Sequence, residues 1–287
     1  MQPSTSNFQQ FIMRLKFTII WLGIFIAGLE VRAAESPWAR VVMIGASASA
    51  GFVLDEPLGG AETTRCKLNY YFDAAIQPKH TPVKNLGSAL MFLNPEAFAP
   101  LQVTAATNNH PTLVIGVDFL FWFCYGDGSN DAARAARFEN GLKLLEQIHC
   151  PLVVGDIPDA SYATNTGIIV ADQVPSETAR RAANTRLQQW AKAHPQVTVM
   201  PLAKFMRDTM ANAALTIHGQ TLPAGTTRAL LQADQLHPNP HGAAVLTLGI
   251  LDALVTKQKK YPAANIRWKS EEVFRLGYQA ADKSRQP

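Results

Sequence analysis

Two short stretches, far apart in the chain, carry side chains that could do chemistry together. Residues 234–242 read DQLHPNPHG, which places Asp234 and His237 three residues apart in a proline-rich turn. A carboxylate at this spacing can accept a hydrogen bond from the imidazole Nδ1–H, which fixes the tautomer and leaves Nε2 free as a base. Residues 45–51 read GASASAG, and Ser47 can expose its hydroxyl among such small neighbours. The sequence therefore predicts a serine nucleophile served by a histidine and an aspartate.

The elements that must position these residues are short apolar runs alternating with helical patterns. The turn with Ser47 follows a run at residues 40–44, and similar runs occur at 83–85 (the weakest), 112–117, 151–154 and 197–200. Continuous apolar runs are typical of strands covered on both faces. Apolar residues at helical spacing fill residues 131–148, 176–193 and 240–255. This alternation predicts an α/β fold with a mostly parallel five-stranded sheet, in which ligands bind beyond the carboxyl ends of the strands.

The two stretches together resemble the SGNH/GDSL hydrolase superfamily. That family has a Gly-Asp-Ser block after its first strand and an Asp-x-x-His-Pro block near its C-terminus. The second block is matched closely by residues 234–238, whereas Ala46 replaces the aspartate of the first block. The resemblance covers residues 41–255 and implies a three-layer α/β/α, flavodoxin-like fold. It also implies hydrolysis of carboxylic esters through an acyl-enzyme without a cofactor, with Ser47 as nucleophile, His237 as general acid/base and Asp234 as its orienting group.

The same resemblance implies an oxyanion hole, and here the sequence leaves several candidates. Residues 85–90 (NLGSAL) resemble the second family block, so the backbone donor is the N–H of Gly87 or of Leu90, depending on the alignment. The asparagine of the third block is replaced by Asp118, whose ionised carboxylate would repel an oxyanion. Either Asp118 is protonated or serves another role, or the amide comes from Asn130. Asn130 could equally be the N-cap of the next helix.

The same residues are compatible with other functions. Asp234, His237 and His241 could hold a metal ion, although the intervening prolines oppose a regular helical presentation of the two histidines. Ala46 and Asp118 are compatible with a catalytically impaired descendant that binds an envelope glycan or an ester. The aromatic run at residues 119–125 suits either core packing or the wall of an apolar pocket. For an enzyme, the sequence does not choose among short acyl esters, acylated carbohydrates and lipid ester substrates.

The N-terminal residues predict export. Arg14 and Lys16 precede an uncharged apolar run at residues 17–29, and Ala33 ends a small-residue cleavage site, as in a signal peptide spanning residues 1–33. The run is short for a membrane span, which favours a cleaved signal peptide. An uncleaved membrane anchor is the alternative. We therefore expect a secreted or periplasmic protein with no stable membrane span after cleavage. No other run in the sequence is long and apolar enough for a span.

Composition and net charge limit the classes of partner that the protein is expected to bind. The 287 residues are 47% hydrophobic and carry a net charge of +4, which excludes a disordered chain. Removal of the signal peptide takes away three basic residues and one acidic residue, leaving a net charge of +2. No basic cluster is interleaved with aromatic residues, so nucleic acid is not an expected partner. The oligomeric state is left open.

The remaining chain divides into a predicted hydrolase-like domain and an extension. We expect the domain at residues 38–256, followed by a polar C-terminal extension at 257–287 with a weak helical pattern. Cys66, Cys124 and Cys150 form no CxxC pattern, so we expect three buried thiols, with a single disulfide of unknown pairing as the alternative.

Overall fold

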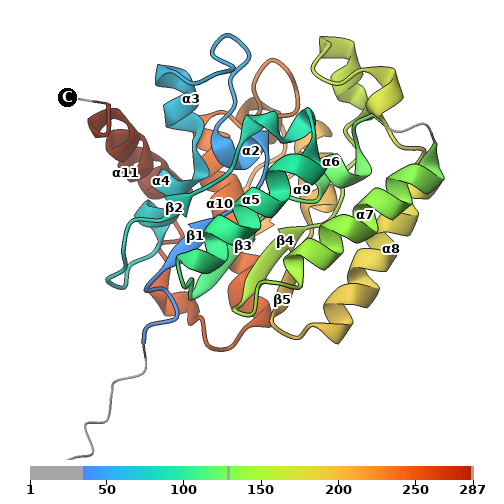
Figure 1. Ribbon diagram of the computed structural model, residues 1–287. Coiled ribbons are helices and arrows are strands. Elements are labelled where there is room, and N and C mark those ends of the chain that lie inside the picture. The colour runs from blue at the N-terminus through green and yellow to red at the C-terminus, as the bar shows by residue number, and fades with distance from the viewer. Residues whose placement is uncertain (1–34, 128–129, 286–287) are drawn as a thin grey trace, which may run out of the picture. The chain divides into compact units, whose positions relative to one another are not determined.

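Five short parallel strands form the central sheet of the structure, a computed structural model that describes residues 35–127 and 130–285 (Figure 1). They are β1 (Val41–Met43), β2 (Lys84–Asn85), β3 (Leu113–Gly116), β4 (Leu152–Gly155) and β5 (Val197–Met200), in the order β2-β1-β3-β4-β5. Every neighbouring pair is parallel. This is the flavodoxin-like order, in which the chain changes direction between β1 and β3. The predicted sheet is confirmed, and the ends of β1 and β3 mark the place where a ligand is expected.

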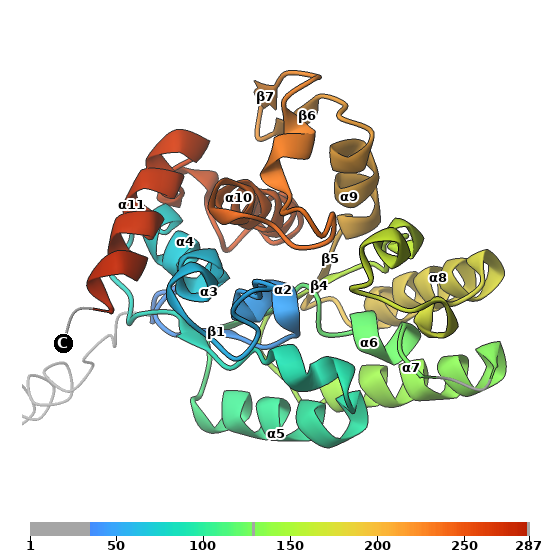
Figure 2. The same ribbon diagram turned by 90° about the horizontal axis from the view of Figure 1, so that it is seen from above.

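In β1, β3, β4 and β5, alternate residues point into two separate apolar layers, which is why these strands are mainly apolar; β2, at the edge of the sheet, is polar and not buried. In β1, Val41 and Met43 belong to one layer and Val42 to the other. The first layer is covered by α4 (Leu68–Ala75), α9 (Leu202–Met210) and α10 (Pro240–Lys257), and the second by α5 (Pro95–Asn108), α7 (Asp131–Leu145) and α8 (Glu177–Ala193). Figure 2 shows these helices on opposite sides of the sheet. The three-layer α/β/α architecture is therefore confirmed.

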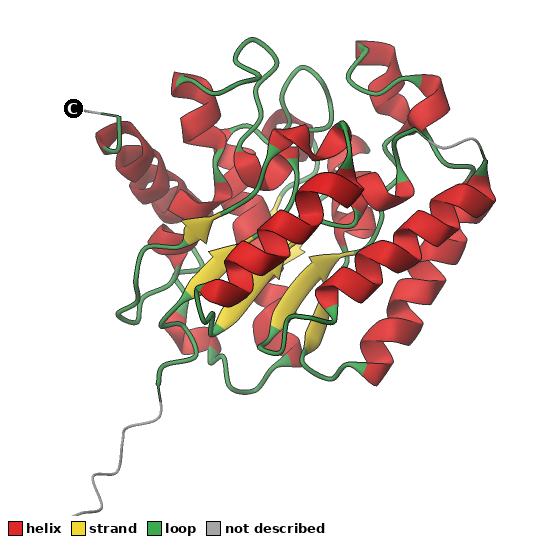
Figure 3. Cartoon of the chain, in the orientation of Figure 1, coloured by secondary structure: helices red, strands yellow, loops and turns green. Residues whose placement is uncertain are grey.

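The long helices begin where their capping residues predict. Asn130, Ser176 and Asn239 each accept a hydrogen bond from the backbone N–H three residues later, at the start of α7, α8 and α10. Figure 3 shows how much of the chain is helical, including elements that the sequence pattern did not reveal. These are α2 (Ser47–Ala50), α3 (Ala61–Cys66), α4, α5, α6 (Phe121–Cys124) and α9, together with the hairpin β6 (Leu215–Ile217) and β7 (Gln220–Leu222). Within the described residues, no helix combines the length and apolarity needed to cross a membrane.

The C-terminal segment corrects one prediction. Residues after 256 are not an appended extension, because the chain from Ser36 to the C-terminus forms a single compact unit. Tyr261 is fully buried with its ring edge against Trp38, and α11 (Ser270–Lys283) packs on α4. A methyl group on Gly277 of α11 would lie 2.5 Å from the Tyr71 ring, so the two helices touch closely. The polar composition that suggested a tail comes from the outer face of this helix.

The three cysteines are free, and the described residues contain no group of three side chains that could hold a metal ion. Cys66 and Cys124 are buried and Cys150 is partly buried. Burial raises the pKa of Cys66 and Cys124 to about 12 and that of Cys150 to about 11. The thiols therefore stay protonated at neutral pH and act as small apolar side chains. The predicted signal peptide, residues 1–33, lies outside the described residues.

Candidate active site

Ser47, His237 and Asp234 form a continuous hydrogen-bonded chain at the carboxyl end of the sheet. The His237 Nδ1 atom lies 2.7 Å from Oδ2 of Asp234, and its Nε2 atom lies 2.7 Å from Oγ of Ser47. Because an aspartate oxygen in this pair accepts, the ring proton sits on Nδ1, and Nε2 is left to accept from the serine hydroxyl. The structure thus brings together residues 190 positions apart in the sequence.

The Asp234 carboxylate is fixed at both oxygens. Its Oδ1 atom accepts from the backbone N–H groups of Leu236 and His237, each at 3.0 Å, while Oδ2 receives the imidazole. Burial works to raise the pKa of Asp234, but the hydrogen bonds and charge of His237 and the two N–H groups outweigh it, so the pKa lies below its usual value. The aspartate is therefore held ionised, as a group that stabilises an imidazolium must be.

Ser47 takes its position from a sharp turn between β1 and α2. Gly45 has φ of +144°, a region that favours glycine, and a Cβ there would lie 2.1 Å from Oδ1 of Asp118. The side-chain amide of buried Gln102, on α5, holds both backbone groups of Gly45: its Oε1 accepts from the N–H at 2.7 Å and its Nε2 donates to the carbonyl at 2.9 Å. The turn that presents Ser47 as the first residue of α2 is thus anchored to the helical layer behind it.

The loop that carries His237 is tied to the serine turn by Gln232. The side-chain Nε2 atom of Gln232 donates to the carbonyl of Phe52, just after α2, at 2.8 Å and to the carbonyl of Pro238 at 2.9 Å. Its backbone N–H also donates to the carbonyl of His237 at 2.9 Å. The Phe52 ring packs against the His237 ring with centroids 4.7 Å apart. The imidazole is therefore held by both segments that form the site.

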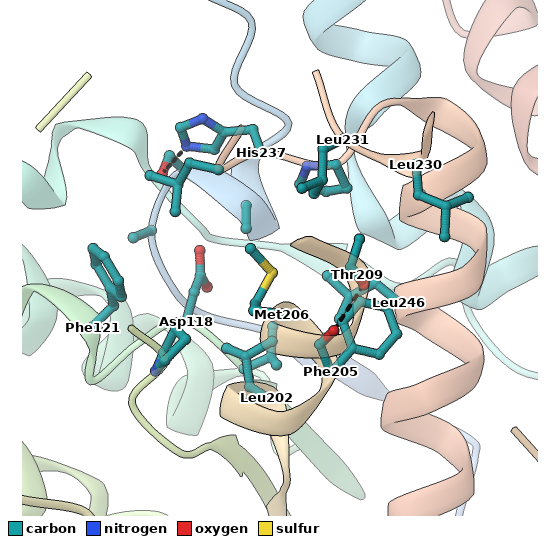
Figure 4. A pocket seen from close by; sticks show the side chains of 18 residues that line it. Asp118, Phe121, Leu202, Phe205, Met206, Thr209, Leu230, Leu231, His237 and Leu246 are labelled. Atoms are coloured by element: carbon teal, nitrogen blue, oxygen red, sulfur yellow. Dashed lines mark hydrogen bonds between the residues drawn. The ribbon is translucent and has the colours of Figure 1, made fainter. Parts of the chain in front are cut away.

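Asp118 follows β3 and points toward the end of the pocket that holds His237 (Figure 4). Its Oδ1 atom accepts from the hydroxyl of Ser49 at 2.6 Å, and its Oδ2 atom accepts from the N–H of Ser49 at 3.1 Å. A carboxylate that accepts at both oxygens has no proton to offer an oxyanion. The structure thus gives Asp118 the role of an acceptor that fixes α2, in place of the donor role considered from the sequence.

The other oxyanion candidates are also engaged within the protein. The N–H of Gly87 donates to Oδ1 of Asn85 at 2.9 Å, and the N–H of Leu90 donates to Oγ of Ser88 at 3.2 Å. Asn130 starts α7, where its side chain accepts from Ala133, and it is not among the residues that line the pocket. The structure therefore does not bring Asn130 to the site, and it supports the capping alternative for this residue.

An apolar pocket opens directly beside Ser47 and His237. Ser47 and His237 lie on its wall together with side chains from α9, α10 and the turn at Thr227–Leu230. Figure 4 shows Leu202, Phe205, Met206, Leu230, Leu231 and Leu246 around this space. Phe121, from the aromatic run, lines the pocket, whereas Phe119 and Phe123 are fully buried in the core. Both uses foreseen for the aromatic run are therefore realised.

Comparisons with known proteins add little to this geometry. No model of a known protein family matches the chain, and no curated protein matches it either. One solved structure that does match is the crystal structure of the lipase/acylhydrolase from Enterococcus faecalis. The two share 19% sequence identity over 80% of this chain and 98% of that chain, with a TM-score of 0.45.

The alternative metal site is not assembled. The His241 ring stacks on Phe274 of α11, with centroids 3.5 Å apart, and its Nε2 atom lies 3.8 Å from Oε2 of Glu271. The residues that the structure describes contain no group of three potential ligands close enough for one metal ion. His237 and Asp234 are instead engaged with each other and with Ser47.

Sequence reasoning missed the supporting residues. Gln102, Gln232 and Ser49 each make the hydrogen bonds described above, yet none belongs to a motif. Their roles depend on contacts between segments distant in the chain, such as Gln232 with Phe52 across 180 positions. Only the alternation of serines at residues 47 and 49, after a predicted strand, carried a local signal.

Proposed function

We propose that this protein is an exported serine hydrolase of the SGNH type that cleaves carboxylic esters through an acyl-enzyme. The observation that carries the proposal is the chain from Asp234 through His237 to Ser47, with both contacts at 2.7 Å. It supplies a nucleophile, a base with a fixed tautomer and an orienting carboxylate. The fold supports the proposal as well, because these three residues lie beyond the carboxyl ends of parallel strands, beside the point where the strand order reverses.

The reaction begins when the Ser47 hydroxyl gives its proton to Nε2 of His237 while Oγ attacks the ester carbonyl. The tetrahedral oxyanion forms beside the start of α2, where the first N–H groups of a helix have no acceptor within it. The N–H of Ser49 is taken by Asp118, so we assign the oxyanion to the N–H groups of Ser47 and Ala48. His237 then protonates the leaving alcohol, and the acyl group stays on Ser47. A water molecule, deprotonated by His237, releases the acid and restores the serine.

A serine-reactive fluorophosphonate probe tests this assignment. We expect the mature protein to be labelled on Ser47, and Ser47→Ala to lose the label. Ser49→Ala is the matched control, because the Ser49 hydroxyl donates to Asp118 rather than to a histidine. It should keep the label. Labelling of Ser49, or no labelling of folded wild-type protein, would contradict the hydrolase.

A second candidate rests on Asp118. A carboxylate stands where the related hydrolases place an amide donor, which suits a protein that binds an envelope glycan or an ester without turnover. This binder would remain unlabelled by the probe while still binding an unreactive ester analogue. Export, proposed for either candidate from residues 1–33, is tested by N-terminal sequencing of protein recovered outside the cytoplasm, where we expect Ala34 as the first residue.

A further inference from the structure

The pocket beside Ser47 offers a ligand almost nothing but carbon. Its walls are built mainly from leucine, phenylalanine and methionine side chains, which come from α9, from Leu246 of α10 and from the segments at residues 121, 230–231 and 236. Thr209 is the polar exception on α9, and its hydroxyl donates to the carbonyl of Phe205 at 2.8 Å. Asp118, at the mouth, has both oxygens engaged with Ser49. A ligand group in this space therefore gains burial of apolar surface and no hydrogen bonds, which selects a hydrocarbon chain.

The pocket is also small. The space open to the centres of water-sized spheres is about 60 Å³. A cavity of about 150 Å³ holds a benzene ring of six carbons, so this space suits only about two to three atoms of methylene size. Leu246 and Phe205 lie on the side away from His237 in Figure 4, and Leu246 is 4% exposed, so the chain does not pass through to solvent there. A long acyl chain cannot enter without moving these side chains.

The part of an ester that occupies this space is the acyl part. The alcohol must leave the site and be replaced by water before the second half of the reaction, whereas the acyl group stays bonded to Ser47 throughout. An apolar space that ends against Leu246 and Phe205 is suited to the group that stays. The alcohol then lies on the open side of Ser47.

We propose that this pocket is an acyl subsite that selects aliphatic acyl groups of about two to three carbons, with Leu246 limiting the length. The inference rests on the proposed hydrolase and narrows its substrate class: esters of short-chain fatty acids, rather than long-chain lipid esters. The identity of the alcohol is left to groups outside the pocket.

Two series of esters test the subsite. With p-nitrophenyl esters from acetate to dodecanoate, we expect kcat/KM to peak at about two to three carbons and to fall at least about tenfold by dodecanoate, because each methylene without a place in the pocket costs affinity in the transition state. With acetate esters of alcohols of increasing length, we expect no such peak. A peak in the alcohol series alone, or an acyl series that favours the longest chain, would overturn the assignment.

Leu246→Ala and Leu248→Ala form a matched pair on α10. Leu246 lines the pocket, whereas Leu248, 2% exposed, belongs to the core and does not line it. Both truncations remove the same atoms and should lower the thermal midpoint similarly. Only Leu246→Ala should move the optimum, by about two to three carbons toward longer chains. An equal shift in both variants would mean that general loosening, rather than the pocket wall, sets the length.

Failure of the subsite and failure of the hydrolase are distinguishable. If the enzyme turns over all chain lengths equally, the hydrolase stands and the subsite is wrong. If no ester is turned over, the subsite is tested by calorimetry of Ser47→Ala with unreactive methyl n-alkyl ketones. Tightest binding for an alkyl chain of about two to three carbons would keep the pocket and discard the reaction. No dependence on chain length would discard both.

Discussion

Replacing Asp118 by asparagine is the change that most directly tests how this site handles negative charge. Asp118 accepts from the hydroxyl and the N–H of Ser49, so it fixes α2 but gives no proton to an oxyanion. Asparagine can keep one acceptor for the N–H of Ser49. Its amide nitrogen then faces the Ser49 hydroxyl, which turns to accept, and a second amide hydrogen is left for the oxyanion.

The expected magnitudes follow from these two bonds. Hydrogen bonds to charged groups contribute about 1.5–3 kcal/mol and neutral ones about 0.5–1.5 kcal/mol, so Asp118→Asn should lower the free energy of unfolding by about 2 kcal/mol. In a chain of this size that is a fall of about 4–8 °C in the thermal midpoint. One side-chain donor to an oxyanion contributes about 10²- to 10³-fold in kcat. We take the lower end, since the same amide must also hold Ser49.

The assay is the steady-state hydrolysis of p-nitrophenyl butyrate, with the thermal midpoint measured on the same preparations. We expect Asp118→Asn to raise kcat by about 10²-fold at a cost in stability. Asp118→Ala is the control: it removes the carboxylate but adds no donor, and it leaves both Ser49 groups unpaired, so it should be less stable still without that gain. A folded Asp118→Asn protein with kcat reduced more than about tenfold would refute the reasoning, because the carboxylate itself would then be needed for turnover.

The remaining predictions concern the catalytic chain and the start of α2. Ser47→Ala, His237→Ala and the double variant should show similar residual esterase rates, because the two residues act as a unit; additive losses would contradict that. Asp234→Asn should stay folded but lose turnover, because the imidazole would favour the wrong tautomer. The pKa of Asp234 is lowered in the folded protein, so its contribution to stability is present above its usual pKa of 3.8 and is lost as the pH falls through the folded value. The acid unfolding curves of wild type and Asp234→Asn should therefore converge below about pH 4. Curves that stay parallel would exclude this linkage. Adding Ala46→Asp to Asp118→Asn should recover the lost thermal midpoint, because an aspartate at residue 46 can accept from the same N–H; a double variant less stable than either single one would show that it cannot.

The sequence predicted those parts of the structure that depend on local pattern. Four of the five strands were visible as apolar runs because they are buried on both faces, whereas β2 is a polar, partly exposed edge strand and gave the weakest pattern. The helices α7, α8 and α10 were visible because a capping residue precedes each of them. The helix α5 was not, because Pro100 interrupts its pattern, and α11 was taken for part of a tail because only one side of it is buried. In both cases packing against other elements, rather than local propensity, decides the structure.

The catalytic chain was predictable for a different reason. Asp234 and His237 are neighbours in sequence, and the turn between them fixes their pairing locally. The pairing of His237 with Ser47 required one further argument, that parallel strands end at a common edge. The oxyanion hole could not be reached in this way. Whether the N–H of Gly87 or Leu90 is free depends on Asn85 and Ser88, whose side chains take up those donors.

Ala46 and Asp118, which appeared in the sequence as two separate departures from the hydrolase pattern, are one exchange in the structure. Residue 46 is the N-cap of α2, where an aspartate would accept from the N–H of Ser49 at the third helical position. Ala46 makes no such bond, and Asp118 makes it from the neighbouring strand end. The carboxylate that accepts from this N–H thus belongs to Asp118, across the site, rather than to residue 46. Ala46, 1% exposed, packs in the apolar layer instead. Asp118 therefore supplies the acceptor that Ala46 lacks, and under the proposed mechanism the consequence falls on the oxyanion, which forms beside a carboxylate.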